Sequence, residues 1–162
     1  MTRRVAIKTL LVGTLVLAAV WCARHYAVHT IGEEAAFMSP AVEPPSLRLL
    51  AGGPGQLPPR GAVVWLDDPR GGGRALLARV VGVPGDRIAV EGGRLIRNGE
   101  PVAEPYAQEL LPAEELAEIV VPAWHVYVLN DRRGARGSFE VDSRGLGPLA
   151  AAHVRGWFGA EP

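Results

Sequence analysis

Residues 75–102 read ALLARVVGVPGDRIAVEGGRLIRNGEPV, and this stretch decides the fold. Its apolar run at 75–83 favours a strand. The run stops at Pro84-Gly85-Asp86, where proline presets φ and glycine tolerates a positive φ. Short apolar runs flank Gly92-Gly93, which favours a two-residue hairpin connection, and Asn98-Gly99 makes a second turn. The stretch therefore predicts consecutive antiparallel strands joined by tight turns.

Further short apolar runs on both sides of this stretch extend the pattern. The run at 62–66 (AVVWL) is β-branched and aromatic and ends at an Asp-Asp-Pro turn, as strands do. Three later runs, at 119–121, 125–129 and 153–158, have the same character, and 110–116 is expected to be an exposed loop or a short helical turn. No long helical period follows residue 35, so we expect an all-β domain.

The composition supports a folded domain and excludes some function classes. Hydrophobic residues make up 48% of the 162 residues, enough for a core. The 17 basic and 17 acidic residues cancel, which argues against a nucleic-acid binder, because such a protein needs a basic face. Cys22 is the single cysteine, so an internal disulfide is impossible. No His/Cys spacing indicates a metal site, and no cofactor is expected.

An apolar segment near the N-terminus predicts a membrane anchor. Residues 9–23 (TLLVGTLVLAAVWCA) carry no charge, and a spanning helix of about 20 residues results if Lys8 snorkels to the headgroups. Arg3, Arg4 and Lys8 precede the segment and Arg24 follows it. This bias predicts a cytoplasmic N-terminus, a single pass through the cell membrane and an extracytoplasmic domain.

A cleaved signal peptide and a lipoprotein signal are the alternatives to a retained anchor. Small residues are expected at a cleavage site, but Trp21-Cys22-Ala23 follows the apolar run. Trp21 also occupies the place where a lipoprotein needs a small residue before its cysteine. The retained anchor is therefore favoured. The expected organisation is an anchor at 1–30, a juxtamembrane connector at 31–37 and a β domain at 38–162.

Three ordered motifs resemble those of a known family. Residues 78–86 (ARVVGVPGD), followed by 93–102 (GRLIRNGEPV), are similar to K-R-V-V-G-x-P-G-D and a hairpin with N-G-x-P-V. Residues 121–131 (VPAWHVYVLND) are similar to V-P-x-G-H-Y-F-V-x-G-D-N, and 142–147 (DSRGLG) to D-S-R-x-x-G. In order and spacing, these motifs resemble the signal peptidase I (leader peptidase) family over about residues 38–158.

The resemblance implies a membrane-tethered, signal-peptidase-like antiparallel β domain that cleaves signal peptides from exported proteins. In that family a serine hydroxyl attacks the scissile carbonyl and a buried lysine accepts the proton. The lysine needs an apolar setting, because only its neutral amine has a lone pair to give. A backbone N–H and a neighbouring hydroxyl stabilise the oxyanion.

The residues that would perform this chemistry are missing at the matching positions. The family's nucleophile motif S-x-S-M-x-P-T-L aligns with residues 38–47, which puts Ala41 or, in a shifted alignment, Val42 in the nucleophile position. Ala78 occupies the base position. Lys8 is the only lysine of the chain and lies at the anchor, so no Ser–Lys dyad can form in the β domain.

Other residues of the motifs match the family, and two nearby serines could replace the missing nucleophile. Ser39 and Ser46 flank the nucleophile position and are the alternative nucleophiles, and His125 is expected to be a packed strand residue. Asp142 and Arg144 match residues that support the family's lysine, although an ion pair closing a strand is the favoured role here. The residues expected to give such support or structure are Arg79, Asp86, Asp131, Asp142, Ser143 and Arg144.

Three functions remain open on the sequence. The first is a pseudopeptidase that binds exported preproteins or signal-peptide segments by strand addition along 75–83, with an active peptidase or a secretion component as a further partner. The second is an active signal peptidase with a non-standard site. The third is a structural membrane protein without a peptide groove. The first is our preferred hypothesis.

Overall fold

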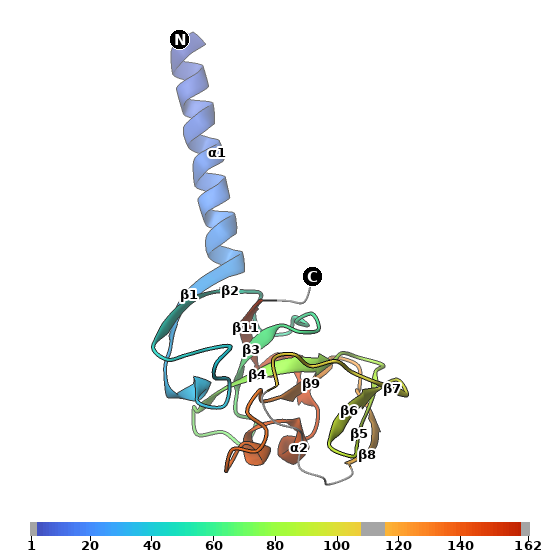
Figure 1. Ribbon diagram of the computed structural model, residues 1–162. Coiled ribbons are helices and arrows are strands. Elements are labelled where there is room, and N and C mark those ends of the chain that lie inside the picture. The colour runs from blue at the N-terminus through green and yellow to red at the C-terminus, as the bar shows by residue number, and fades with distance from the viewer. Residues whose placement is uncertain (1–2, 108–115, 160–162) are drawn as a thin grey trace.

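Figure 1 shows the computed structural model, which describes residues 3–107 and 116–159: a long N-terminal helix stands on one end of a β domain. The helix is α1 (Arg3–His25). The strands are β1 (Tyr26–Ile31), β2 (Ser46–Ala51), β3 (Val63–Asp67), β4 (Ala75–Gly82), β5 (Arg87–Glu91), β6 (Arg94–Arg97), β7 (Glu100–Pro101), β8 (Leu116–Val120), β9 (His125–Leu129), β10 (Leu149–Ala150) and β11 (Val154–Phe158). Short helical turns are η1 (Glu33–Ala35), η2 (Phe139–Val141), α2 (Ser143–Leu146) and η3 (Ala151–His153).

The strands form two antiparallel sheets. The larger sheet has the order β1-β2-β11-β3-β4-β9-β10, and the smaller one the order β7-β6-β5-β8. The predicted all-β domain is confirmed, and β3, β4 and β9 lie within one residue of the expected runs. The Gly92-Gly93 hairpin joins β5 to β6, as the sequence predicts. Residues 110–115 of the expected loop lie outside the described residues, and Leu116 begins β8.

The first strand lies within the residues expected to form the anchor (1–30) and the connector (31–37). Helix α1 ends at His25, and Tyr26 is already the first residue of β1. The reason is long-range pairing, because all six residues of β1 pair with β2, from Tyr26 with Ala51 to Ile31 with Ser46. Residues 7–25 form a helix long and apolar enough to cross a membrane.

Strands β3 and β4 separate two hydrophobic clusters, since alternate side chains of a strand point to opposite faces. Cluster one contains Ala78 and nine other buried side chains: Val64, Leu66, Leu76, Val80, Val126, Val128, Val141, Leu149 and Val154. Cluster two contains Ile31, Ala35, Met38, Val42, Leu50, Val63, Trp65 and Leu77. A third cluster lies between β4, β9 and the smaller sheet.

Candidate functional site

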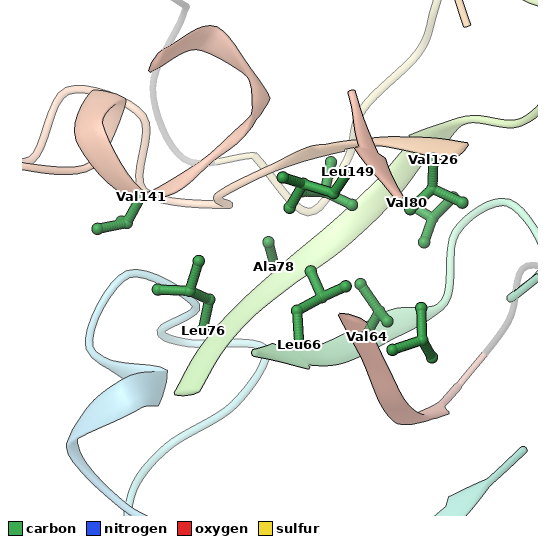
Figure 2. Close-up of a cluster of buried hydrophobic side chains, with 10 residues drawn as sticks. Val64, Leu66, Leu76, Ala78, Val80, Val126, Val141 and Leu149 are labelled. Carbon is green, nitrogen blue, oxygen red and sulfur yellow. The ribbon is translucent and has the colours of Figure 1, made fainter. Parts of the chain in front are cut away.

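The position that matches the family's base lies in the hydrophobic core. Ala78 is fully buried at the centre of β4. Figure 2 shows its methyl group among the side chains of cluster one, between Leu76 and Val80 of the same strand. Every member of this cluster is apolar, so a charged amine placed there would be strongly penalised. The only lysine, Lys8, lies in α1.

The two residues at the nucleophile position have different environments. Ala41 is exposed, and Val42 is buried in cluster two, where its backbone N–H donates to the Met38 carbonyl at 2.9 Å. Val42 shares cluster two with Leu77, whose side chain points away from that of Ala78. Neither residue carries a hydroxyl, so the structure offers no nucleophile in this position.

The serines of the chain do not form a catalytic pair with a base among the described residues. Ser39 is half-buried. The Ser46 hydroxyl is buried and has no hydrogen-bond partner in the described part of the chain. Ser138 donates to the Arg133 carbonyl at 2.8 Å, and the Ser143 hydroxyl accepts from the Val128 N–H at 2.9 Å. The last two hydroxyls therefore serve the fold.

Three of the four histidines, His25, His29 and His125, contact the backbone or an aromatic ring. His125 is half-buried at the start of β9, and its Nδ1 lies 2.8 Å from the Ala123 carbonyl oxygen. The ring of His29 meets the ring of Trp65 edge-on, with the centroids 4.4 Å apart. In residues 3–107 and 116–159, no group of three or more His, Cys, Asp or Glu side chains is placed to hold a metal ion.

Asp86 holds the turn between β4 and β5. Burial tends to raise the pKa of its carboxyl. The opposing effect of the Arg60 guanidinium, the Val83 N–H and the Asn98 amide is larger and lowers the pKa to about 2. Arg60 donates from Nε and Nη2 at 2.9 and 2.6 Å. The ionised carboxylate of Asp86 thus stabilises the Pro84-Gly85-Asp86 turn.

Arg79, which follows Ala78, links strands instead of serving a base. It donates to both carboxylate oxygens of Asp131 at 2.9 and 2.6 Å and to the Gly61 carbonyl at 2.9 Å. Its guanidinium also lies 4.1 Å from the centre of the Tyr106 ring. The Arg79–Asp131 pair therefore ties the middle of β4 to the residues after β9.

The Asp142-Ser143-Arg144 motif completes the outer side of β9. The Asp142 carboxylate accepts from the Asn130 N–H at 3.1 Å and from the Arg144 N–H at 3.0 Å, which also caps α2. Arg144 pairs with Asp142 at 2.8 Å and donates to the Ser138 hydroxyl at 2.9 Å. The Asp142 carboxylate and the Ser143 hydroxyl thus accept hydrogen bonds from the N–H groups of Asn130 and Val128, which a neighbouring strand would otherwise accept.

One buried ion pair was not predicted from the sequence. Arg133 and Glu104 pair through both guanidinium Nη atoms, and their side chains are 2% and 9% exposed. Tyr106 donates to the same carboxylate at 3.2 Å, and burial raises the pKa of its phenol. The partners lie 29 residues apart, and no local pattern connects them. Only the pairing of distant segments could have indicated this contact.

Among residues 3–107 and 116–159, no strand pairs with one edge of the N-terminal half of β4, which is called the free edge below. Strand β4 pairs with β3 from Ala75 to Arg79, but with β9 only from Arg79 onward. The hydrogen bonds of Arg74 and Val80 point toward the β3 side. Because these directions alternate along an antiparallel strand, the N–H and C=O groups of Ala75 and Leu77 point to the unpaired side. This part of β4 can therefore accept another strand.

A narrow cleft lies beside this free edge. Its free volume of about 20 Å³ is enough for a water molecule and too small for a peptide side chain. Its lining residues come from η1 and the segment after it, from the start of β4 and the residue before it, and from the end of η2: Glu33, Glu34, Phe37, Arg74, Ala75, Leu76, Leu77 and Val141. A peptide at this edge must therefore displace side chains such as that of Phe37.

Comparisons with known proteins place these features in a family. The family model described as "Signal peptidase, peptidase S26" matches residues 6–159. A signal peptidase I from Leptolyngbya laminosa is 36% identical over 87 residues, which are 51% of this chain and 41% of the relative. A probable signal peptidase I-1 from Synechocystis sp. (strain ATCC 27184 / PCC 6803 / Kazusa) is 36% identical over 61 residues, 38% of this chain and 31% of the relative.

The chain spans less than half the length of these two relatives. The fold has a counterpart in the crystal structure of a signal peptidase I from Enterococcus faecalis V583. That likeness has a TM-score of 0.52 at 23% identity and covers 64% of this chain and 98% of the other. It shows the fold alone. Because the family model extends over nearly the whole sequence, the chain belongs to the signal peptidase family, peptidase S26.

Proposed function

We propose that this chain is a membrane-anchored signal peptidase homologue that binds extended segments of exported proteins without cleaving them. The observation that carries the proposal is the position of Ala78, a methyl group within a cluster of ten apolar side chains where the family has its base. The only lysine lies in α1, far along the chain from this position.

The chemistry of the family depends on groups that this site lacks. Loss of a serine nucleophile or its base typically costs about a millionfold in rate in a serine protease. Here the nucleophile position is Ala41 or Val42, and neither side chain can attack a carbonyl. The alternative nucleophiles, Ser39 and Ser46, have no hydrogen bond to a histidine or carboxylate among the described residues.

The free edge of β4 supports binding in place of catalysis. An added strand would bond to the N–H and C=O groups of Ala75 and Leu77, which is how many domains bind extended peptides. Helix α1 would hold this edge near a membrane, and the charges before it favour a cytoplasmic N-terminus and an extracytoplasmic domain. Signal-peptide segments and an active peptidase or secretion component are the proposed partners.

Peptide binding to the full chain in detergent tests the proposal. We expect a fluorescent signal peptide to bind and Ala75→Pro to weaken binding about tenfold, because proline removes an N–H from the free edge without removing a bond to β3. Val120→Pro is the matched control. Its N–H points away from β5, because the N–H of the adjacent Val121 bonds to Asp86. Absence of binding by the unmodified chain would favour a structural membrane protein.

A cleavage assay tests the alternative of an active signal peptidase. The full chain is incubated in detergent with a preprotein, and we expect no removal of the signal peptide. Efficient removal would overturn the proposal. Removal that persists in the Ser39→Ala, Ser46→Ala double variant would further show that neither flanking serine is the nucleophile.

A further inference from the structure

The segment that follows η1 passes around the free edge of β4. The side chains of Ala35 and Met38 are fully buried in cluster two, whereas Phe37, which lies between them, packs against cluster one. These clusters lie on opposite faces of the sheet, so the short segment reaches both only at an edge. The edge is that of β4, because Phe37 lines the narrow cleft together with Ala75 and Leu77. The Phe37 ring therefore lies where an added strand would place a side chain.

Contacts on the far side of the cleft hold the ring in this position. The Phe37 carbonyl accepts from the Arg132 N–H at 2.9 Å. A Cβ at Gly137 would lie 3.8 Å from Phe37 Cζ, so the tip of the ring reaches the loop that precedes η2. In Figure 2 the blue chain that contains η1 passes beside Leu76, at the end of cluster one that also holds Val141. The ring thus spans the space between β4 and the loop after β9.

Phe37 is packed less tightly than the residues around it. The other large apolar side chains that line the cleft are buried, whereas Phe37 is half-buried. Its neighbours Ala35 and Met38 are fixed in cluster two, and the Met38 N–H donates to the Ala35 carbonyl at 2.8 Å. A change of the Phe37 χ1 rotamer would therefore move the ring off the edge while the backbone stays in place.

We propose that the Phe37 ring is an autoinhibitory gate, which closes the free edge of β4 until a side chain of a bound segment replaces it. The inference rests on the proposed binding of extended segments at this edge. The closed ring leaves a free volume of only about 20 Å³, so a strand adds only to molecules whose ring has turned outward. The segment that binds carries a large apolar side chain at this point, because Leu76 and Val141 form the wall that the ring now covers.

Peptide binding to the full chain in detergent tests the gate. We expect Phe37→Ala to bind a fluorescent signal peptide about tenfold more tightly than the unmodified chain, which corresponds to an outward ring in about one molecule in ten. Phe139→Ala is the matched control and should bind like the unmodified chain, because Phe139 lies on the neighbouring η2, is 41% exposed and does not line the cleft. Adding Ala75→Pro to Phe37→Ala should remove the gain, since the proline acts on the same edge.

Fluorine NMR follows the ring itself in the full-length chain. With 4-fluorophenylalanine at all three phenylalanines, the Phe37 resonance is the one that is absent from the spectrum of Phe37→Ala. We expect saturating peptide to shift this resonance toward that of free 4-fluorophenylalanine and to leave the Phe139 resonance in place. A Phe37 resonance that does not shift at saturation overturns the gate, whether or not Phe37→Ala folds.

The binding outcomes separate the gate from the proposed function. Equal affinity of the unmodified chain and Phe37→Ala overturns the gate and leaves peptide binding intact. Weaker binding by Phe37→Ala, in a variant that unfolds at the same temperature as Phe139→Ala, also overturns the gate, because the ring would then belong to the binding surface. Absence of binding by both the unmodified chain and Phe37→Ala overturns the gate and the proposed function together.

Discussion

The side chains of Val42 and Ala78 lie on opposite faces of the sheet that contains β3 and β4. Ala78 belongs to the cluster with Val64 and Leu66, whereas Val42 belongs to the cluster with Leu77. Consecutive residues of a strand point to opposite faces, and Leu77 precedes Ala78. The shifted alignment, which puts Val42 at the nucleophile position, therefore separates the nucleophile and base positions by the thickness of the sheet.

This separation predicts that the Val42→Ser, Ala78→Lys double variant has no peptidase activity. The introduced hydroxyl and amine would face different clusters and could not exchange a proton. The measurement is signal-peptide removal from a preprotein by the full chain in detergent, with the unmodified chain as the control. Cleavage by the double variant alone would contradict this arrangement of the two positions.

Ala78→Lys alone should destabilise the protein by about 3–5 kcal/mol, because it introduces bulk and an ammonium group into an apolar cluster. Desolvation lowers the folded-state pKa of such a lysine. The unfolded chain then binds more protons at pH 7, and the loss should shrink as pH rises toward 10. Denaturant unfolding of the full chain measures both effects. Ala117→Lys on the exposed strand β8 is the control, and an equal, pH-independent loss in both variants would contradict the prediction.

Arg144→Ala should cost about 3–5 kcal/mol of folding free energy, because the Asp142 carboxylate would remain buried without its partner. The side chains of Arg144 and Asp142 are 2% and 0% exposed. Arg136→Ala is a control on the loop that precedes η2 and α2, since Arg136 is exposed, and it should cost less than about 0.5 kcal/mol. Thermal unfolding followed by circular dichroism compares the two. Similar losses would contradict a structural role for the Asp-Ser-Arg motif.

Asp86→Asn should reduce stability at pH 7 by about 1–2 kcal/mol, since it removes the charge that pairs with Arg60. The folded-state pKa of Asp86, about 2, lies below the ordinary value of 3.8. Its contribution is therefore present above pH 4 and is lost as pH falls toward 2. Unfolding measured between pH 2 and 7 should show that the variant loses less stability than the unmodified chain as the pH falls. Asp67→Asn, in a pair with both side chains about 40% exposed, should change little.

Trp124→Gly should stabilise the protein by about 0.5–1 kcal/mol. Trp124 has a φ of 60°, in the left-handed region that glycine adopts at no steric cost, and its side chain is 67% exposed. The Signal peptidase I motif V-P-x-G-H has glycine at this position. Trp124→Ala keeps the backbone strain and should give no gain, which makes it the control. A greater loss in Trp124→Gly than in Trp124→Ala would show that φ strain is not the larger effect.

The amino-acid sequence by itself determined strands β4, β5 and β6, the tight turns between them and the absence of a lysine after Lys8. Turn residues at Pro84-Gly85-Asp86 and Gly92-Gly93 act locally, so β4, β5 and β6 could be predicted from neighbouring residues. The absence of a lysine after Lys8 holds for any fold. These properties depend on composition or on a few adjacent residues, and tertiary packing does not alter them.

The tertiary structure decided which residues meet. The pairing of β1 with β2 ended α1 at His25, earlier than the expected boundary, because six cross-strand pairs compete with helix there. The opposite orientation of Val42 and Ala78, the free edge of β4 and the Glu104–Arg133 pair also arise from contacts between distant segments. Such contacts depend on sheet order and register, which local propensity does not specify.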